Sequence, residues 1–152
     1  MRGVRLALAS AFILASCGSS PTPLSTTPDT TQGVLCNASR DLVASINRTT
    51  QAAAAGAGTS LSEQLARQAR SLAEQSHDRL QSITADVIRR STGWQALLSA
   101  YLHAGQAANA LLPEYNAPAV TAGELRSARS ALDEAAHAGL DPECFLPSSS
   151  TE

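Results

Sequence analysis

Apolar and small residues recur at alternating steps of three and four positions through most of the chain after residue 30. This spacing places side chains on one face of an α-helix. Four segments carry it, with inward positions at Leu35, Leu42, Ile46, Thr49 and Ala53; at Leu61, Leu65, Ala69, Leu72, Ser76, Leu80, Ile83 and Val87; at Trp94, Leu97, Leu98, Tyr101, Gly105, Ala108 and Leu112; and at Leu125, Ala128, Leu132, Ala135 and Gly139. No comparable alternation of period two, typical of a half-buried strand, is visible. The pattern predicts an all-α fold.

Start and stop signals divide the pattern into the same four helices. In a capping box, a side-chain oxygen accepts a hydrogen bond from a free backbone N–H at the helix start, and the side chain of a Glu or Gln three residues later accepts one from the backbone N–H of the capping residue. Pairs with this spacing occur at Asp29 and Gln32, Ser60 and Glu63, Thr92 and Gln95, and Thr121 and Glu124. Residues that favour helix ends follow at Gly56, Gly58, Gly93, Pro113 and Gly139.

Four helices joined by short loops pack most simply as an antiparallel up-down-up-down bundle, which we expect over residues 29–146. One helix is unusually long, because residues 60–91 would extend over roughly 48 Å at a rise of about 1.5 Å per residue. Its neighbours would be nearer about 30 Å long. We therefore expect this helix either to overhang the bundle or to kink near residues 76–78.

The start of the chain has the order of a bacterial export signal. Arg2 and Arg5 precede an apolar run over residues 6–15. The run is shorter than the roughly 20 residues that a membrane-spanning helix needs, so residues 1–16 are predicted to be a removable signal peptide. Leu-Ala-Ser-Cys at residues 14–17 resembles the lipobox of bacterial lipoproteins, in which the Cys thiol is acylated and becomes the new N-terminus. The resemblance implies that Cys17 carries the lipid.

This resemblance also implies where the protein is found. We expect an exported chain that is lipid-anchored to the bacterial cell membrane or outer membrane, with its domain outside the cytoplasm. An ordinary secreted protein with a chance Cys at the cleavage site is the alternative. Residues 17–28 are rich in Ser, Thr and Pro, which predicts a disordered tether, and residues 147–152 are predicted to be a disordered tail. The tether composition also resembles O-glycosylated stalks, so glycosylation stays open.

The two remaining cysteines predict a disulfide bridge. An exported chain meets an oxidising compartment. Cys36 stands near the start of the first predicted helix and Cys144 after the end of the last. An up-down-up-down bundle brings these two places to one end, so the predicted bridge and topology support each other. Two free catalytic thiols are the alternative, but they lack the CxxC spacing typical of redox sites.

The charge balance bears on the choice of partner. The chain has 11 basic residues, all of them Arg, and 13 acidic residues. Without Arg2 and Arg5 it is weakly acidic, which gives no general electrostatic attraction to nucleic acid. We therefore expect no nucleic-acid partner. The expected contacts are with the membrane, through the lipid, and with another envelope or surface protein.

Few residues suggest chemistry, and we expect no enzyme, no cofactor and no metal site. The carboxylates are scattered, and no phosphate-binding loop, nucleophile elbow or HExxH motif is present. Asp133 and His137 stand four positions apart and could meet on one helix face. Two such ligands make a weak zinc site, since zinc usually takes three or four protein ligands. A surface ion pair is the alternative.

Tyr101 and His103 suggest haem ligation through a resemblance to the small secreted haem carriers of mycobacteria. Those proteins also bring one Cys near each end of a short helical chain, and Cys36-Asn37 followed by Leu-Val-Ala at residues 42–44 is similar. The resemblance implies an alternative function as a carrier of a small ligand, either haem or a lipid. Residues two positions apart on a helix point about 200° apart, however, so these two side chains do not line one pocket wall.

Trp94 has two interpretations. It stands in the first turn of the third predicted helix, where such a residue commonly closes the end of a bundle. It could instead be an exposed anchor for a partner protein, a role in which Trp is over-represented. Together, these features predict a lipid-anchored envelope protein whose helical bundle acts as a protein–protein interaction module.

Overall fold

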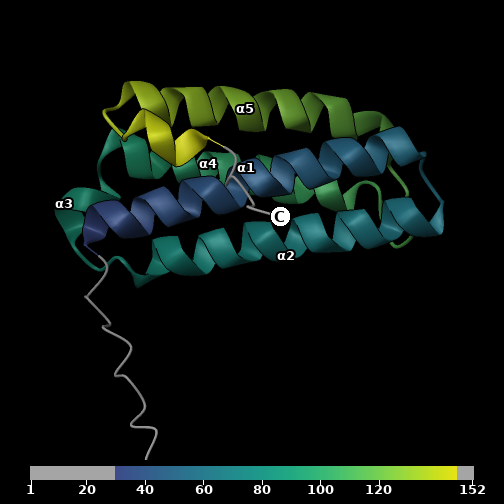
Figure 1. Ribbon diagram of the computed structural model, residues 1–152, viewed down its shortest axis with the longest axis horizontal. Helices are drawn as coiled ribbons and strands as arrows, with labels where there is room; N and C mark the ends of the chain where they lie inside the picture. The colour runs from purple at the N-terminus through teal and green to yellow at the C-terminus, as the bar shows by residue number, and fades with distance from the viewer. Residues whose placement is uncertain (1–29, 147–152) are drawn as a thin grey trace, which may run out of the picture.

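The computed structural model describes residues 30–146 as a set of helices (Figure 1). The predicted signal peptide, the whole predicted tether and the predicted tail lie outside the described residues. The elements are α1 (Thr31–Ala55), α2 (Ser60–Ser82), α3 (Asp86–Arg89), α4 (Thr92–Asn109), α5 (Thr121–His137) and two 3₁₀ turns, η1 (Pro118–Val120) and η2 (Pro142–Phe145). No strand occurs within residues 30–146, which confirms the all-α prediction.

The four long helices each run antiparallel to the next one along the chain, as Figure 1 shows. α1 and α2 form one hairpin and α4 and α5 form the other. The hairpins pack together through contacts of α4 with both α1 and α2. The start of α1, the short α3, the start of α4 and η2 gather at one end of the bundle (Figure 1). We call this the entry end, because the described chain enters the bundle there.

α1 and α2 pack through small side chains. α2 buries Ser62, Ala66, Ala69, Ala73, Ser76 and Leu80. The Ser45 hydroxyl of α1 donates a hydrogen bond to the Ala69 carbonyl of α2 at 2.7 Å, which requires the two helices to approach closely. The buried hydroxyls of Ser39 and Thr49 donate to carbonyls one turn back in α1, so these polar groups are satisfied without water.

The inward face of α2 differs from the predicted one. Leu61 is 56% exposed and Val87 is 77% exposed, although both were predicted to lie inward. Leu65 and Leu72 are only half-buried. The small residues one position further along form the contact with α1, because two closely packed helices leave no room for Leu between their backbones.

The prediction of one helix over residues 60–91 is wrong. α2 passes residues 76–78 as regular helix and ends at Ser82, so it neither overhangs nor kinks there. Ile83 takes an extended conformation with φ −79° and ψ 111°, and its side chain is buried in the core. The indole N–H of Trp94 donates to the Leu80 carbonyl at 3.2 Å. In a continuing helix that carbonyl would accept from residue 84, so the bond to Trp94 favours the break.

The predicted capping residues of three helices are wrong by one position. Thr59 caps α2 by accepting from the Ser62 N–H, and Ser91 caps α4 by accepting from the Trp94 N–H. Thr30 caps α1 in the same way, at Gly33. In each case two adjacent residues can both act as caps, and spacing alone did not distinguish them. α5 continues directly from η1 and has no side-chain cap, so its predicted capping box is also wrong.

Cys36 of α1 and Cys144 of η2 form the predicted disulfide, with their Cα atoms 4.8 Å apart. After α5 ends, the chain turns back so that η2 lies against α1 (Figure 1). Cys144 is 2% exposed. The bridge joins residues 108 positions apart and therefore ties the first helix to the last described turn at the entry end.

Replacing both Cys36 and Cys144 by Ser is expected to lower the free energy of unfolding by about 2–5 kcal/mol, because it removes a cross-link that closes a long loop. Urea denaturation followed by circular dichroism would measure the difference. As a control, a reducing agent should lower the midpoint of the wild type to that of the double variant and leave the variant unchanged. Equal midpoints of the two proteins under oxidising conditions would contradict the prediction.

Candidate functional site

Trp94 lies inside the entry end of the bundle. It is 4% exposed, and its indole N–H is bonded to the Leu80 carbonyl. The guanidinium carbon of Arg89 lies 5.6 Å from the centre of the ring, a cation–π arrangement. This geometry fits the interpretation of Trp94 as the residue that closes the end of the bundle. A partner-anchor role would require exposed indole surface, of which there is very little.

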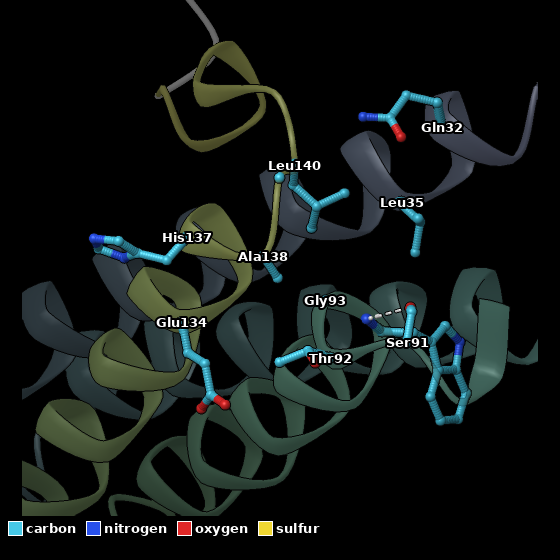
Figure 2. Close-up of a pocket in the computed structure, with 11 residues that line it drawn as sticks. Gln32, Leu35, Ser91, Thr92, Gly93, Glu134, His137, Ala138 and Leu140 are labelled. Carbon is cyan, nitrogen blue, oxygen red and sulfur yellow. Dashed lines mark hydrogen bonds between the residues drawn. The ribbon is translucent and has the colours of Figure 1, made fainter. Parts of the chain in front are cut away.

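A cleft of about 540 Å³ opens beside Trp94, between the start of α4 and the end of α5 (Figure 2). Leu35 and Leu140 supply buried apolar surface, and Thr92 and Glu134 supply polar side chains. Figure 2 shows the imidazole of His137 pointing away from the other lining residues. The volume lies within the range of small-molecule sites, so the cleft is one candidate binding site.

Tyr101 and His103 face different helices. The Tyr101 ring stacks on His77 of α2, with ring centroids 4.5 Å apart. His103 Nδ1 lies 2.7 Å from the Glu124 carboxylate of α5. The structure therefore does not bring Tyr101 and His103 together at one site, as their spacing predicted. Their actual partners had no signal in the sequence, because each belongs to another helix.

Asp133 and His137 do not form the expected ion pair. His137 Nδ1–H donates to the backbone carbonyl of Asp133 at 2.6 Å, and both residues are exposed. Within residues 30–146, no group of three or more His, Cys, Asp or Glu side chains lies close enough to hold a metal ion.

Ion pairs occur on the surfaces of the helices. Arg79 of α2 pairs with Asp41 of α1 at 2.8 Å, and Arg67 pairs with Glu114 at 3.1 Å. A backbone N–H hydrogen bond, assisted by Arg67, lowers the pKa of Glu114. The hydrogen bond to Glu74 raises the pKa of Arg70. Apart from Asp41, which is partly buried, these groups are largely exposed, so solvent screening keeps their contribution to stability small.

The outer face of α4 is uncharged. The chain has no Asp, Glu, Lys or Arg between Arg90 and Glu114. Leu102 is 52% exposed, and Leu98 and Tyr101 are half-buried against the core. At Gly105 a Cβ atom would meet nothing within 4 Å. The helical period places these four residues on one side of α4, and we call them the α4 patch: Leu98, Tyr101, Leu102 and Gly105.

Sequence reasoning missed both the cleft and the α4 patch. The cleft is formed by segments that meet only in the folded chain. The patch could have been found from the long uncharged stretch, but Leu98, Tyr101 and Gly105 were assigned to the inward face and Leu102 was not considered. No helix within residues 30–146 is long and apolar enough to cross a membrane. Neither a protein-family model, nor a curated protein, nor a solved structure matches the chain.

Because Trp94 is the single Trp of the chain, intrinsic fluorescence reports on its surroundings. We expect the folded protein to emit at short wavelength and to resist quenching by iodide, since the ring is buried. Unfolding in urea should shift the emission to the red and restore quenching to the level of free tryptophan amide. Strong iodide quenching in the folded protein would contradict the buried placement and favour the partner-anchor interpretation.

Proposed function

We propose that this chain is an exported bacterial lipoprotein whose helical bundle acts as a protein–protein interaction module at the cell envelope. The observation that supports export and lipid anchoring is the Leu-Ala-Ser-Cys sequence at residues 14–17, at the end of a short apolar run with Arg on its N-terminal side. The described helical body begins at Thr31, a short distance after Cys17. Such a short connection would hold the bundle near the membrane to which the lipid is anchored.

The Cys36–Cys144 disulfide is independent support for export. Structural disulfides persist in oxidising compartments and are rare in the cytosol, where thiols are kept reduced. Cys144 is buried at the centre of this contact, as expected for a structural bridge. The proposed lipid and the disulfide are therefore both consistent with a helical domain outside the cytoplasm.

The proposed interaction surface is the α4 patch. A partly exposed helix face that lacks charge can be desolvated by a partner at low cost, whereas a charged face would need paired charges on the partner. Helix faces of this kind dock against other helices or into grooves. Tyr101 adds an aromatic side chain of the type that is enriched at the centre of protein interfaces.

A carrier of a small ligand is the second candidate function, and the cleft beside Trp94 is the observation that favours it. Its mixture of apolar floor and polar rim suits a small amphipathic molecule. The cleft is less suited to haem, because Tyr101 and His103 do not line it and contact different helices.

The two candidates differ in what the protein carries when it is purified from its native host. We expect no visible absorbance and no small molecule beyond the covalent lipid in native mass spectrometry. A Soret band, or a second mass that is lost on denaturation, would favour the carrier. A Thr92→Trp variant, which fills the cleft, would then serve as the control, since it should lose the bound molecule.

The anchor itself is tested by replacing Cys17 with Ser. We expect the wild type to fractionate with membranes and to carry an acylated N-terminal Cys, and the variant to be released to the medium or periplasm. A diacylated or triacylated Cys holds a protein firmly, so the difference should be nearly complete. Ser20→Ala, which leaves Cys17 intact, is the control. Membrane retention of the Cys17→Ser chain, or a wild-type terminus without acyl chains, would show that the lipoprotein proposal is wrong.

A further inference from the structure

We propose that the α4 patch is a self-association surface, and that its partner is a second copy of this chain. The proposal deepens the proposed function, because it names the partner of the surface assigned to the interaction module. The charge, the shape and the size of the face support it.

The absence of charge suits contact between identical surfaces. In a two-fold symmetric contact each patch meets its own copy, so a charged patch would bring like charges together. The α4 patch has no charged residue. The exposed faces of the neighbouring helices are different, since α2 carries Arg67, Arg70 and Glu74, and α5 carries charges of both signs. Of these surfaces, the α4 face is the one suited to meeting itself.

The shape of the patch is complementary to itself. Leu102 projects from α4 and is 52% exposed, while Gly105, one turn away, leaves open space where a side chain would stand. If two copies pack with α4 antiparallel around an axis between these residues, Leu102 of each copy lies over Gly105 of the other. The two-fold axis repeats this contact, so each Leu102 side chain fills the open space beside Gly105 of the other copy.

No close contact at the Cβ position requires a glycine at residue 105 within its own chain. Gly in the middle of a helix lowers helix stability relative to Ala, because it loses more backbone freedom on folding. The open space around Gly105 means that no neighbour in this chain requires the missing side chain. Close approach of a second helix at this point would use it, because small residues let helix axes come near each other.

The size of the face predicts a weak dimer. The 18 residues of α4 form a helix about 27 Å long. A contact along one face of such a helix buries less than the roughly 800 Å² per partner of a standard interface. Lipid anchorage at Cys17 would compensate by confining the copies to one plane, which raises their effective concentration. This step rests on the proposed function.

Sedimentation velocity over a wide concentration series tests the surface apart from the anchor. The full chain with Cys17→Ser is used, because it has no acyl group and can associate only through protein contacts. We expect a reversible monomer–dimer equilibrium. Adding Leu102→Arg should weaken dimerisation about tenfold or more, because it places like charges in the contact. Leu61→Arg is the matched control, since Leu61 is similarly exposed, at 56%, but lies on α2.

A second variant separates association from folding. In Gly105→Leu the added Cβ atom meets nothing within 4 Å in the monomer, and Leu favours helix more than Gly does. We expect this variant to melt at the same or a higher temperature than its parent and yet to dimerise more weakly. The melting temperature should therefore stay the same or rise while the affinity of the dimer falls.

Three outcomes would overturn the self-association proposal: a chain that is monomeric at every concentration, a Leu102→Arg variant that dimerises like its parent, or a Leu61→Arg variant that is equally weakened. The lipid anchor is measured separately, by the mass of the wild-type N-terminus and by its fractionation. If the protein dimerises but its wild-type N-terminus is not acylated, the self-association proposal is supported and the lipid-anchor proposal is refuted. If the N-terminus is acylated but the protein is monomeric, the lipid-anchor proposal is supported and the self-association proposal is refuted.

Discussion

The close approach of α1 and α2 is the constraint on which the rest of the structure depends. The bond from the Ser45 hydroxyl to the Ala69 carbonyl spans the two helices directly, and this is possible because the residues between the backbones are Ala and Ser. Such a contact gains dispersion energy from dense packing, but each Ala buries less apolar area than a Leu would. The core is therefore compact but modest for its length. A cross-link that lowers the entropy of the unfolded chain contributes a correspondingly larger share of the stability.

The features that tie the chain together lie at the entry end. The disulfide joins the first helix to the last described turn there, and Trp94 joins the start of α4 to the end of α2 through the Leu80 carbonyl. The opposite end is closed by a smaller separate cluster in which Leu111 and Leu112 pack on Ala52 and Ala66. The end nearest the proposed anchor is thus fastened by one covalent bond and one buried hydrogen bond. The far end is held by these apolar contacts and by the Arg67–Glu114 ion pair.

The sequence allowed the helices, their antiparallel order and the disulfide to be predicted, because each follows from local spacing or from simple topology. The inward face of α2 could not be predicted in the same way. Hydrophobicity ranks Leu61 above Ser62, but the close contact with α1 selects the smaller residue. The break after Ser82 has no Gly or Pro to mark it, and its partner in space is Trp94, far along the chain. The same limit applies to the candidate surfaces. The stacking of Tyr101 on His77 and the pairing of His103 with Glu124 arise from helix packing, which no single-helix pattern contains.

The uncharged face of α4 is not a consequence of burial. Gln95, Leu102 and Gln106 are exposed, and a Glu or Arg at any of these positions would extend into solvent as it does on α2 and α5. Contact with the core therefore does not explain why the whole stretch between Arg90 and Glu114 lacks charge. The contact proposed for this face would explain it, because burying an unpaired charge costs far more than burying an amide or a Leu side chain. The composition of α4 is thus matched to the proposed additional helix neighbour, beyond the α1, α2, α3 and α5 that it contacts within the chain.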